Sequence, residues 1–536
     1  MNAEVLGPPL PLWESLGTAS ARLFANSARN RRLVLSLLLT PICAAAAAEP
    51  PHSPPLEIQE VACPAAHGAQ APVLATGPDG TVWMAWAEPL SPASAGWALR
   101  CVEFDSAIGQ WRRPHSVVTG RRLNPGGIDL PSLAAGGEGQ LFVAWSEPAT
   151  GTGGHRSFFC SSSDSGLTWT APASLSREDS DVSYPALAFL ADGRVLAAWL
   201  DRNGQPGSDA GAGLFLRFLT GSLASAPDWL LDGRSSGGSQ PALAPLLDGG
   251  AVLAYRGLSE TGVEDPRIAR LHGRKWENRH TICSDGWKGG GAEAGGPRMA
   301  ADGGRLVAAW RTANAIDPHI LVSTSPDAGA RFLAPLQVNA DFPEGLPGVA
   351  LLHDGAALLV WCERDSKGSA NAWVRRLAPD FSLNSPLLLG PSSPRSPEPV
   401  PQIAVVHDYA GDVFAAQAII AYHASGGPSE VRTVILNVPE ADLLSVADAN
   451  CHCLPSPMQL IGYSLLGTVV YVAYDRTSVT IESDTMPGVL DAGRHVFAID
   501  PELAKVLQPG RECLAHILRK DGKWRLYDAR LLETAR

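Results

Sequence analysis

The sequence predicts an all-β fold: a β-propeller of seven four-stranded blades, followed by a small, mainly β module. Two observations carry this prediction, a strand–turn–strand phrase that recurs every 51 to 61 residues and a high content of turn-forming residues. The chain of 536 residues contains 54 glycines and 44 prolines, as many short strands joined by tight turns require. Its length is ample for a large core or for two domains.

The repeated phrase starts with an apolar strand after a proline, turns at glycine or Asp-Gly, and ends in a strand that closes on an aromatic residue. Seven copies occur, at Pro72–Trp86, Pro131–Trp145, Pro185–Trp199, Pro241–Tyr255, Pro297–Trp310, Pro347–Trp361 and Pro401–Tyr422. Each copy is followed by a third strand and a short fourth one, which together make a propeller blade. Leu56–Val61 reads as a last strand without partners, so it is predicted to complete the seventh blade. A six-bladed ring with an accessory hairpin is the alternative.

The two ends of the chain differ from the repeats. Residues 1–48 are predicted to be a signal peptide with an N-terminal extension, because a basic stretch precedes the short apolar run Leu33–Leu39 and small residues follow it. We expect cleavage near Ala48 and export to the periplasm or the medium. The propeller is assigned to residues 56–439, where the repeat stops. Residues 440–536 are predicted to be the mainly β module, with one short helix after Asp500.

Charge and cysteine content narrow the set of partners. Lys and Arg total 42 and Asp and Glu total 54, so the net charge is −12, which argues against duplex nucleic acid and anionic membranes. Cys101 and Cys160 occupy equivalent places in neighbouring repeats and are predicted to be buried thiols. Cys451-His452-Cys453 brings three metal-ligand types together, but a disulfide from this pair to Cys513 is favoured. No cofactor and no metal site are predicted.

A tight turn gives the strongest link to a known family. Ser162, Asp164, Gly166 and Trp169 form an S-x-D-x-G-x-T-W stretch, in which the carboxylate accepts turn N–H groups and glycine supplies a positive φ. A looser copy comprises Ser325, Asp327, Gly329 and Phe332. The stretch resembles the Asp-box of the sialidase superfamily, whose members are β-propellers. The resemblance implies a sialidase-like propeller with these turns on the face opposite the active site.

Charged or polar residues recur just past the aromatic that ends each second strand. That end of the blade is expected on the top face, where propellers carry their sites. The residues are Glu88, Glu147, Asp201, Arg202, Arg256, Arg311, Glu363, Arg364 and His423. One interpretation is a funnel that binds a polar ligand, with guanidinium groups gripping a carboxylate. The other interpretation is a solvated rim, at which charged side chains stay in water and have little effect on stability.

The resemblance to exo-sialidases implies three arginines around a substrate carboxylate, a tyrosine nucleophile activated by a glutamate, and an aspartate acid/base. The family's Arg-Ile-Pro motif is absent here. Arg256 and Arg311 stand in suitable places for two arginines, and Arg202 or Arg364 for the third. Asp201 is the candidate acid. Tyr184 is the candidate nucleophile, since Tyr255 is more simply a repeat aromatic.

The chain resembles bacterial exported sialidase-like proteins more closely, over most of residues 60–440. It keeps their Asp285-Gly286-Trp287 and Gly296-Pro297 but has Gly289–Glu293 between them, and residues 231–238 lack the group's cysteines. The resemblance therefore implies a divergent member. We expect it to bind a glycan or another polar ligand on the top face without efficient hydrolysis. An exo-α-sialidase type of glycoside hydrolase is one alternative, and a periplasmic scaffold for a protein partner is the other.

Overall fold

The structure, a computed structural model, consists almost entirely of antiparallel β-sheet. It describes residues 57–531 apart from 91–95, 124–128, 150–153, 176–179, 204–210, 220–227, 274, 289–294, 313–317, 353–354, 394–398, 409–414, 425–429, 440–462, 474–475, 484–489, 491, 500–502, 506 and 521–522. The predicted signal peptide and Cys451–Cys453 lie outside the described residues. Nowhere in the described part of the chain is there a helix long and apolar enough to span a bilayer.

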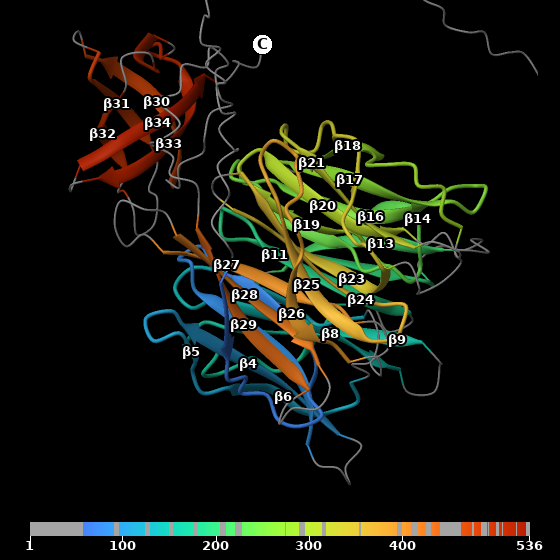
Figure 1. The fold of residues 1–536 in the computed structure, drawn as a ribbon. Helices are drawn as coiled ribbons and strands as arrows, with labels where there is room; N and C mark the ends of the chain where they lie inside the picture. The colour runs from blue at the N-terminus through green and yellow to red at the C-terminus, as the bar shows by residue number, and fades with distance from the viewer. Residues whose placement is uncertain are drawn as a thin grey trace, which may run out of the picture. The chain divides into compact units, whose positions relative to one another are not determined.

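Each repeat folds into an antiparallel unit of four strands, or of five in the first unit (Figure 1). The inner strands are β2 (Gln70–Thr76), β7 (Ser132–Ala135), β11 (Val182–Phe189), β15 (Ala242–Pro245), β19 (Arg298–Asp302), β23 (Phe342–Leu351) and β27 (Gln402–Asp408). The second strands are β3 (Val82–Pro89), β8 (Leu141–Pro148), β12 (Val195–Asp201), β16 (Ala251–Leu258), β20 (Arg305–Thr312), β24 (Ala357–Arg364) and β28 (Ala415–His423). The third strands are β4 (Trp97–Asp105), β9 (His155–Ser162), β13 (Ala212–Leu219), β17 (Glu264–His272), β21 (His319–Ser325), β25 (Ala370–Leu377) and β29 (Val431–Pro439). The outer strands are β5 (Gln110–Trp111) with β6 (His115–Arg121), β10 (Ala173–Ser174), β14 (Trp229–Ser235), β18 (Lys275–Thr281), β22 (Leu336–Gln337), β26 (Leu387–Pro391) and β1 (Glu57–Val61).

The inner strands follow one another in a circle. Each contacts the next inner strand in chain order, and β27 contacts β2. The strand β1 pairs with β29, from Glu57 opposite Asn437 to Val61 opposite Thr433, so the predicted completion of the last unit by the first strand is confirmed. A circle of seven inner strands favours seven blades over the six-bladed alternative.

The second strands carry the core. Along β3 and β12 residues on both faces are buried, because another sheet packs against each face, and these strands therefore read as continuous apolar runs. The seven repeat aromatics are all buried: Trp86, Trp145, Trp199, Tyr255, Trp310, Trp361 and Tyr422. Cys101 and Cys160 are buried free thiols, as predicted, and burial raises their pKa values to about 12 and 11.

The Asp-box stretch forms the predicted turn between β9 and β10. Asp164 Oδ1 accepts a hydrogen bond from Thr168 N at 2.9 Å, and Ser162 Oγ accepts one from Gly166 N at 2.9 Å. The φ of Gly166 is +75°, which explains the need for glycine. Trp169 folds back and donates its indole N–H to Gly166 O. The looser copy between β21 and β22 repeats the serine and aspartate bonds through Ser325, Asp327 and Gly329, and Phe332 packs against a neighbouring core cluster.

The C-terminal module is a closed five-stranded barrel, which the sequence did not predict beyond its β content. Its strands are β30 (Tyr463–Val472), β31 (Ser478–Ser483), β32 (Gly493–Ala498), β33 (Glu512–Lys520) and β34 (Lys523–Leu531), hydrogen-bonded in the order β30-β31-β32-β34-β33. The predicted helix is a single 3-10 turn, η2 (Leu503–Lys505). Cys513 is a buried free thiol, so the predicted disulfide to Cys451 or Cys453 is wrong.

Candidate functional site

Three predicted ligand-binding carboxylates are bonded to a tryptophan two residues earlier on the same strand. Residues i and i+2 share one face of a strand, so the indole N–H reaches the carboxylate. The nitrogen–oxygen distances are 3.0 Å for Trp86–Glu88, 2.6 Å for Trp145–Glu147 and 2.9 Å for Trp361–Glu363. Arg100 and Arg121 form ion pairs with the first two carboxylates. We name these pairs the Trp–Glu clamps. Their carboxylates already have donors from the protein itself.

One unit without the glutamate supports this account. Thr312 takes the place of glutamate on β20, and Trp310 Nε1 is buried with no hydrogen-bond partner in the described part of the chain. The hydroxyl of threonine is too short to reach an indole two residues away along the strand. The glutamate therefore satisfies the buried indole N–H where it is present.

Arg256 was predicted to bind a ligand, but it is buried within the fold. Its Nε donates to Gly295 O at 3.0 Å, while Nη1 and Nη2 donate to Glu264 O at 2.5 Å and Arg311 O at 2.6 Å. The guanidinium also lies 5.2 Å from the ring centroid of Trp287, in the Asp-Gly-Trp segment. Burial lowers the pKa of Arg256, and the nearby Asp285 opposes that shift. Arg256 thus joins three segments of the chain, and no edge of its guanidinium group is left for a ligand.

Two other predicted residues are also held at the ends of second strands. Arg364 Nε pairs with Glu344 Oε1 at 2.6 Å on the adjacent strand β23. His423 Nε2 lies 3.4 Å from Glu430, and burial lowers the pKa of the imidazole. These contacts join neighbouring segments of the same units.

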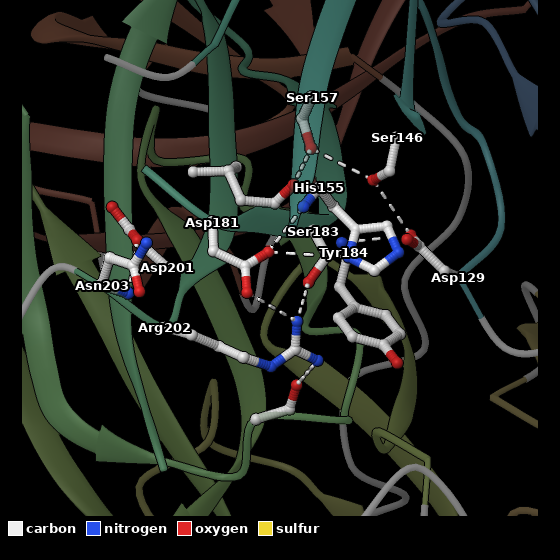
Figure 2. Close-up of polar contacts among 12 residues, drawn as sticks. Asp129, Ser146, His155, Ser157, Asp181, Ser183, Tyr184, Asp201, Arg202 and Asn203 are labelled. Atoms are coloured by element: carbon white, nitrogen blue, oxygen red, sulfur yellow. Dashed lines mark hydrogen bonds and ion pairs between the residues drawn. The ribbon is translucent and has the colours of Figure 1, made fainter. Parts of the chain in front are cut away.

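Arg202 is different, because it meets other titratable side chains at a partly open edge between the second and third units. It follows β12, whereas Asp181 precedes β11 and His155 begins β9 (Figure 2). Asp181 lies 3.6 Å from Arg202 Nη1 and 3.5 Å from His155 Nδ1, and accepts His155 N at 2.7 Å. About a third of the Arg202 and His155 side chains is exposed (35% and 36%). We name Arg202, Asp181 and His155 the edge cluster.

A partly buried carboxyl residue, Asp129, lies beside the edge cluster (Figure 2). Its Oδ1 accepts hydrogen bonds from Ser146 Oγ at 3.2 Å and from Tyr184 N at 3.1 Å. Ser146 continues to Ser157, whose hydroxyl donates to Val182 O. Burial raises the pKa of Asp129 to about 6, although these hydrogen bonds and the charges of His155 and Arg202 oppose the shift. The site thus contains a carboxyl group that changes charge in mildly acidic solution.

The two predicted catalytic residues both precede Arg202 in the chain, Tyr184 in β11 and Asp201 as the last residue of β12. Tyr184 sits in a β-bulge of β11 with φ of +58°, and its side chain is buried. Ala71 in β2 has the same bulge and φ of +53°, so this backbone is a feature of the fold and not of one site. Asp201 Oδ1 accepts a hydrogen bond from Asn203 N at 2.9 Å. The structure brings Tyr184, but not Asp201, into contact with Asp129.

The loop after β14 forms a polar wall beside Arg202. Gly237 O accepts Arg202 Nη2 at 2.6 Å. Within residues 235–240, three serine hydroxyls and Gln240 Oε1 are buried and have no hydrogen-bond partner among the described residues. Buried polar atoms without partners are uncommon in folded proteins and indicate a place for water or a polar ligand. Neither here nor elsewhere among the described residues is a group of three or more His, Cys, Asp or Glu side chains arranged to hold a metal ion.

Asp129→Asn is expected to raise the free energy of unfolding at pH 7 by about 3 kcal/mol at most. The raised pKa means that folding disfavours the carboxylate, so wild-type stability falls as pH rises from about 4 to about 6. The neutral carboxamide keeps an acceptor for Ser146 and Tyr184 without that loss. Urea unfolding of both proteins between pH 4 and 8 measures the difference. A difference that does not change with pH would contradict this account of Asp129.

Asp129 was not among the residues predicted from the sequence, although its position in the repeat distinguishes it. It stands two residues before the repeat proline, where the other units have Gln70, Ser183, Ser239, Gly295, Gly345 and Pro399. When the seven repeats are aligned, Asp129 is the one acidic residue at a position that is otherwise uncharged. His155 and Asp181 carry no comparable signal, because each is an ordinary polar residue at the start of a strand.

No known protein family matches the sequence, and no curated protein sequence matches it. Among solved structures, the chain is similar to an ulvan lyase of polysaccharide lyase family PL25, with 11% identity, a TM-score of 0.47, and coverage of 74% of this chain and 100% of the other. It is also similar to a protein of unknown function from Dyadobacter fermentans (13% identity, TM-score 0.42, 72% and 100% coverage). The intramolecular trans-sialidase from Ruminococcus gnavus gives 12% identity, a TM-score of 0.40, and 58% and 95% coverage. Sequence identities at this level assign neither a family nor an activity.

Proposed function

We propose that this chain is an exported, sialidase-like β-propeller that binds a glycan or another polar ligand at the edge cluster, without efficient hydrolysis. The observation that carries the proposal is the partly exposed trio of Arg202, Asp181 and His155. It lies beside a loop with four buried oxygen atoms that have no hydrogen-bond partner in the described part of the chain. Sugars present many hydroxyl groups, which pair with a carboxylate, an imidazole and serine hydroxyls. A guanidinium adds recognition of a sugar carboxylate.

Most of the other predicted residues make contacts within the fold, which disfavours efficient hydrolysis. The three-arginine grip implied by the sialidase resemblance takes Arg256 as one of its arginines, and this residue is enclosed by backbone carbonyls. The carboxylates Glu88, Glu147 and Glu363 are held by the Trp–Glu clamps. Arg202 is partly exposed and lies beside the polar loop, so the proposal rests on this arginine.

One observation favours the glycosidase alternative. Asp129 has a pKa of about 6 and accepts a hydrogen bond from the backbone N–H of Tyr184, so a carboxyl group that is protonated in mildly acidic solution lies next to the predicted nucleophile in the structure. A general acid needs a pKa near the working pH, which Asp129 satisfies. The periplasmic scaffold alternative has no comparable observation.

Binding to a glycan array with sialylated, uronate-containing and neutral sugars tests the proposal. Arg202→Ala is expected to lower affinity for the ligand found by about tenfold or more. Arg112→Ala is the matched control, because this exposed arginine pairs with Glu103 and Asp105 at another place on the first unit. Equal affinity of the Arg202→Ala variant and the wild type would refute the proposed site. Turnover of a fluorogenic sialoside that Asp129→Asn abolishes would establish the glycosidase alternative instead.

A further inference from the structure

A cavity of about 200 Å³ lies within the circle of inner strands and is lined by residues from all seven of them. The residue just after the repeat proline lines it in every unit. In β15 and β23, the strands on either side of β19, this residue is Ala242 or Gly348. In β19 it is Arg298. Small neighbours leave room around the long side chain.

Among the described residues that line the cavity, Arg298 alone is charged. Although part of the residue is accessible, its Nε and Nη2 atoms are shielded from solvent and have no hydrogen-bond partner among the described residues. Burial alone lowers the pKa of Arg298 to about 10, with no carboxylate to oppose the shift. The guanidinium is therefore still a cation at neutral pH. An enclosed charge without a partner is a costly arrangement for a folded protein.

The two unpaired nitrogens lie on the same edge of the guanidinium. That edge presents two parallel N–H groups, the geometry that pairs with two oxygens of a carboxylate, phosphate or sulfate. Further polar groups line the same cavity. Ser132 Oγ accepts Leu187 N at 2.9 Å, which leaves its own proton available for donation, and Gln402 is a second polar lining residue.

We propose that this central cavity is a binding site for one small oxyanion, held by the Nε and Nη2 atoms of Arg298. The anion neutralises the enclosed charge and ties β19 to the other inner strands. The cavity is large enough for such an anion and a few waters, since a water molecule occupies about 30 Å³ of the liquid. The site is distinct from the edge cluster and requires no glycan.

Calorimetric titration of the full chain with sodium sulfate, phosphate or acetate, against a background of sodium chloride, tests the proposal. Wild-type protein is expected to bind one anion per chain and to unfold at a higher temperature when sulfate or phosphate is added. Arg298→Met removes the charge, so this variant should neither bind the anion nor unfold at a higher temperature when the anion is added. Without the anion, the variant should be more stable than wild type. Arg331→Met is the matched control, because this arginine is 84% exposed in the same unit. It should respond as wild type does.

Two further comparisons keep the proposal testable if Arg298→Met does not fold. Arg298→Lys retains the charge but not the paired N–H edge, so its affinity for sulfate should fall by about tenfold. Arg202→Ala should leave anion binding unchanged, which separates this site from the proposed ligand site. The proposal is overturned if wild type binds no anion, if Arg298→Lys binds as tightly as wild type, or if Arg202→Ala removes the response.

Discussion

Arg256→Ala is expected to lower the free energy of unfolding by about 3–5 kcal/mol, because it removes a buried cation together with all of its hydrogen bonds. The carbonyl oxygens of Gly295, Glu264 and Arg311 would each lose a charged donor. The cavity left behind would be too enclosed for solvent to replace those donors fully. Urea unfolding of purified protein, together with soluble yield, measures the loss.

The control for this prediction is Arg364→Ala. Arg364 also ends a second strand, but its side chain is 41% exposed and it pairs with one carboxylate, so the cost should be within about 1 kcal/mol. A ligand-binding role would produce the opposite pattern, with Arg256→Ala as stable as wild type and deficient only in binding. If Arg256→Ala unfolds at the wild-type urea concentration, the structural role assigned to Arg256 is wrong.

Features of the fold that depend on local sequence could be predicted. The Asp-box turn follows from the side chains of Ser162, Asp164 and Gly166, all within five residues. The repeats were visible because each second strand is buried on both faces and must be apolar along its length. Even the pairing of β1 with β29 was predictable, since an unpartnered strand and an incomplete unit stood at opposite ends of the repeats.

The contacts that each charged side chain makes could not be predicted, because they depend on partners that are distant in the sequence. Arg256 and Arg202 both lie near the end of a second strand, yet backbone carbonyls enclose the first while the second stays partly open. Arg121, the partner of Glu147, comes from the unit before it. The order in which strands pair in the C-terminal barrel likewise depends on distant segments, such as β30 and β33. Such pairings produce no local pattern in the sequence.

Trp145→Ala is the second substitution with a large expected effect, a loss of about 3–5 kcal/mol in the free energy of unfolding. Trp145 is 1% exposed, and its ring stacks on Phe158 with centroids 6.1 Å apart. Its removal leaves a large cavity and also deprives Glu147 of the indole donor. Arg121 still pairs with Glu147, so the carboxylate keeps one partner. Urea unfolding at pH 7 measures the loss.

Trp145→Phe separates the two contributions to that loss. Phenylalanine keeps most of the contact with Phe158 but has no N–H for Glu147, so its cost should be about 1–3 kcal/mol. Glu147→Gln, alone and combined with Trp145→Phe, completes a double-mutant cycle, for which bonded residues give coupling energies of about 0.5–3 kcal/mol. Additive costs would mean that the Trp–Glu clamp contributes nothing beyond packing. In that case Glu147 would again be a candidate for ligand binding. Among the described residues, only Arg121 would then stabilise this buried carboxylate at the end of β8.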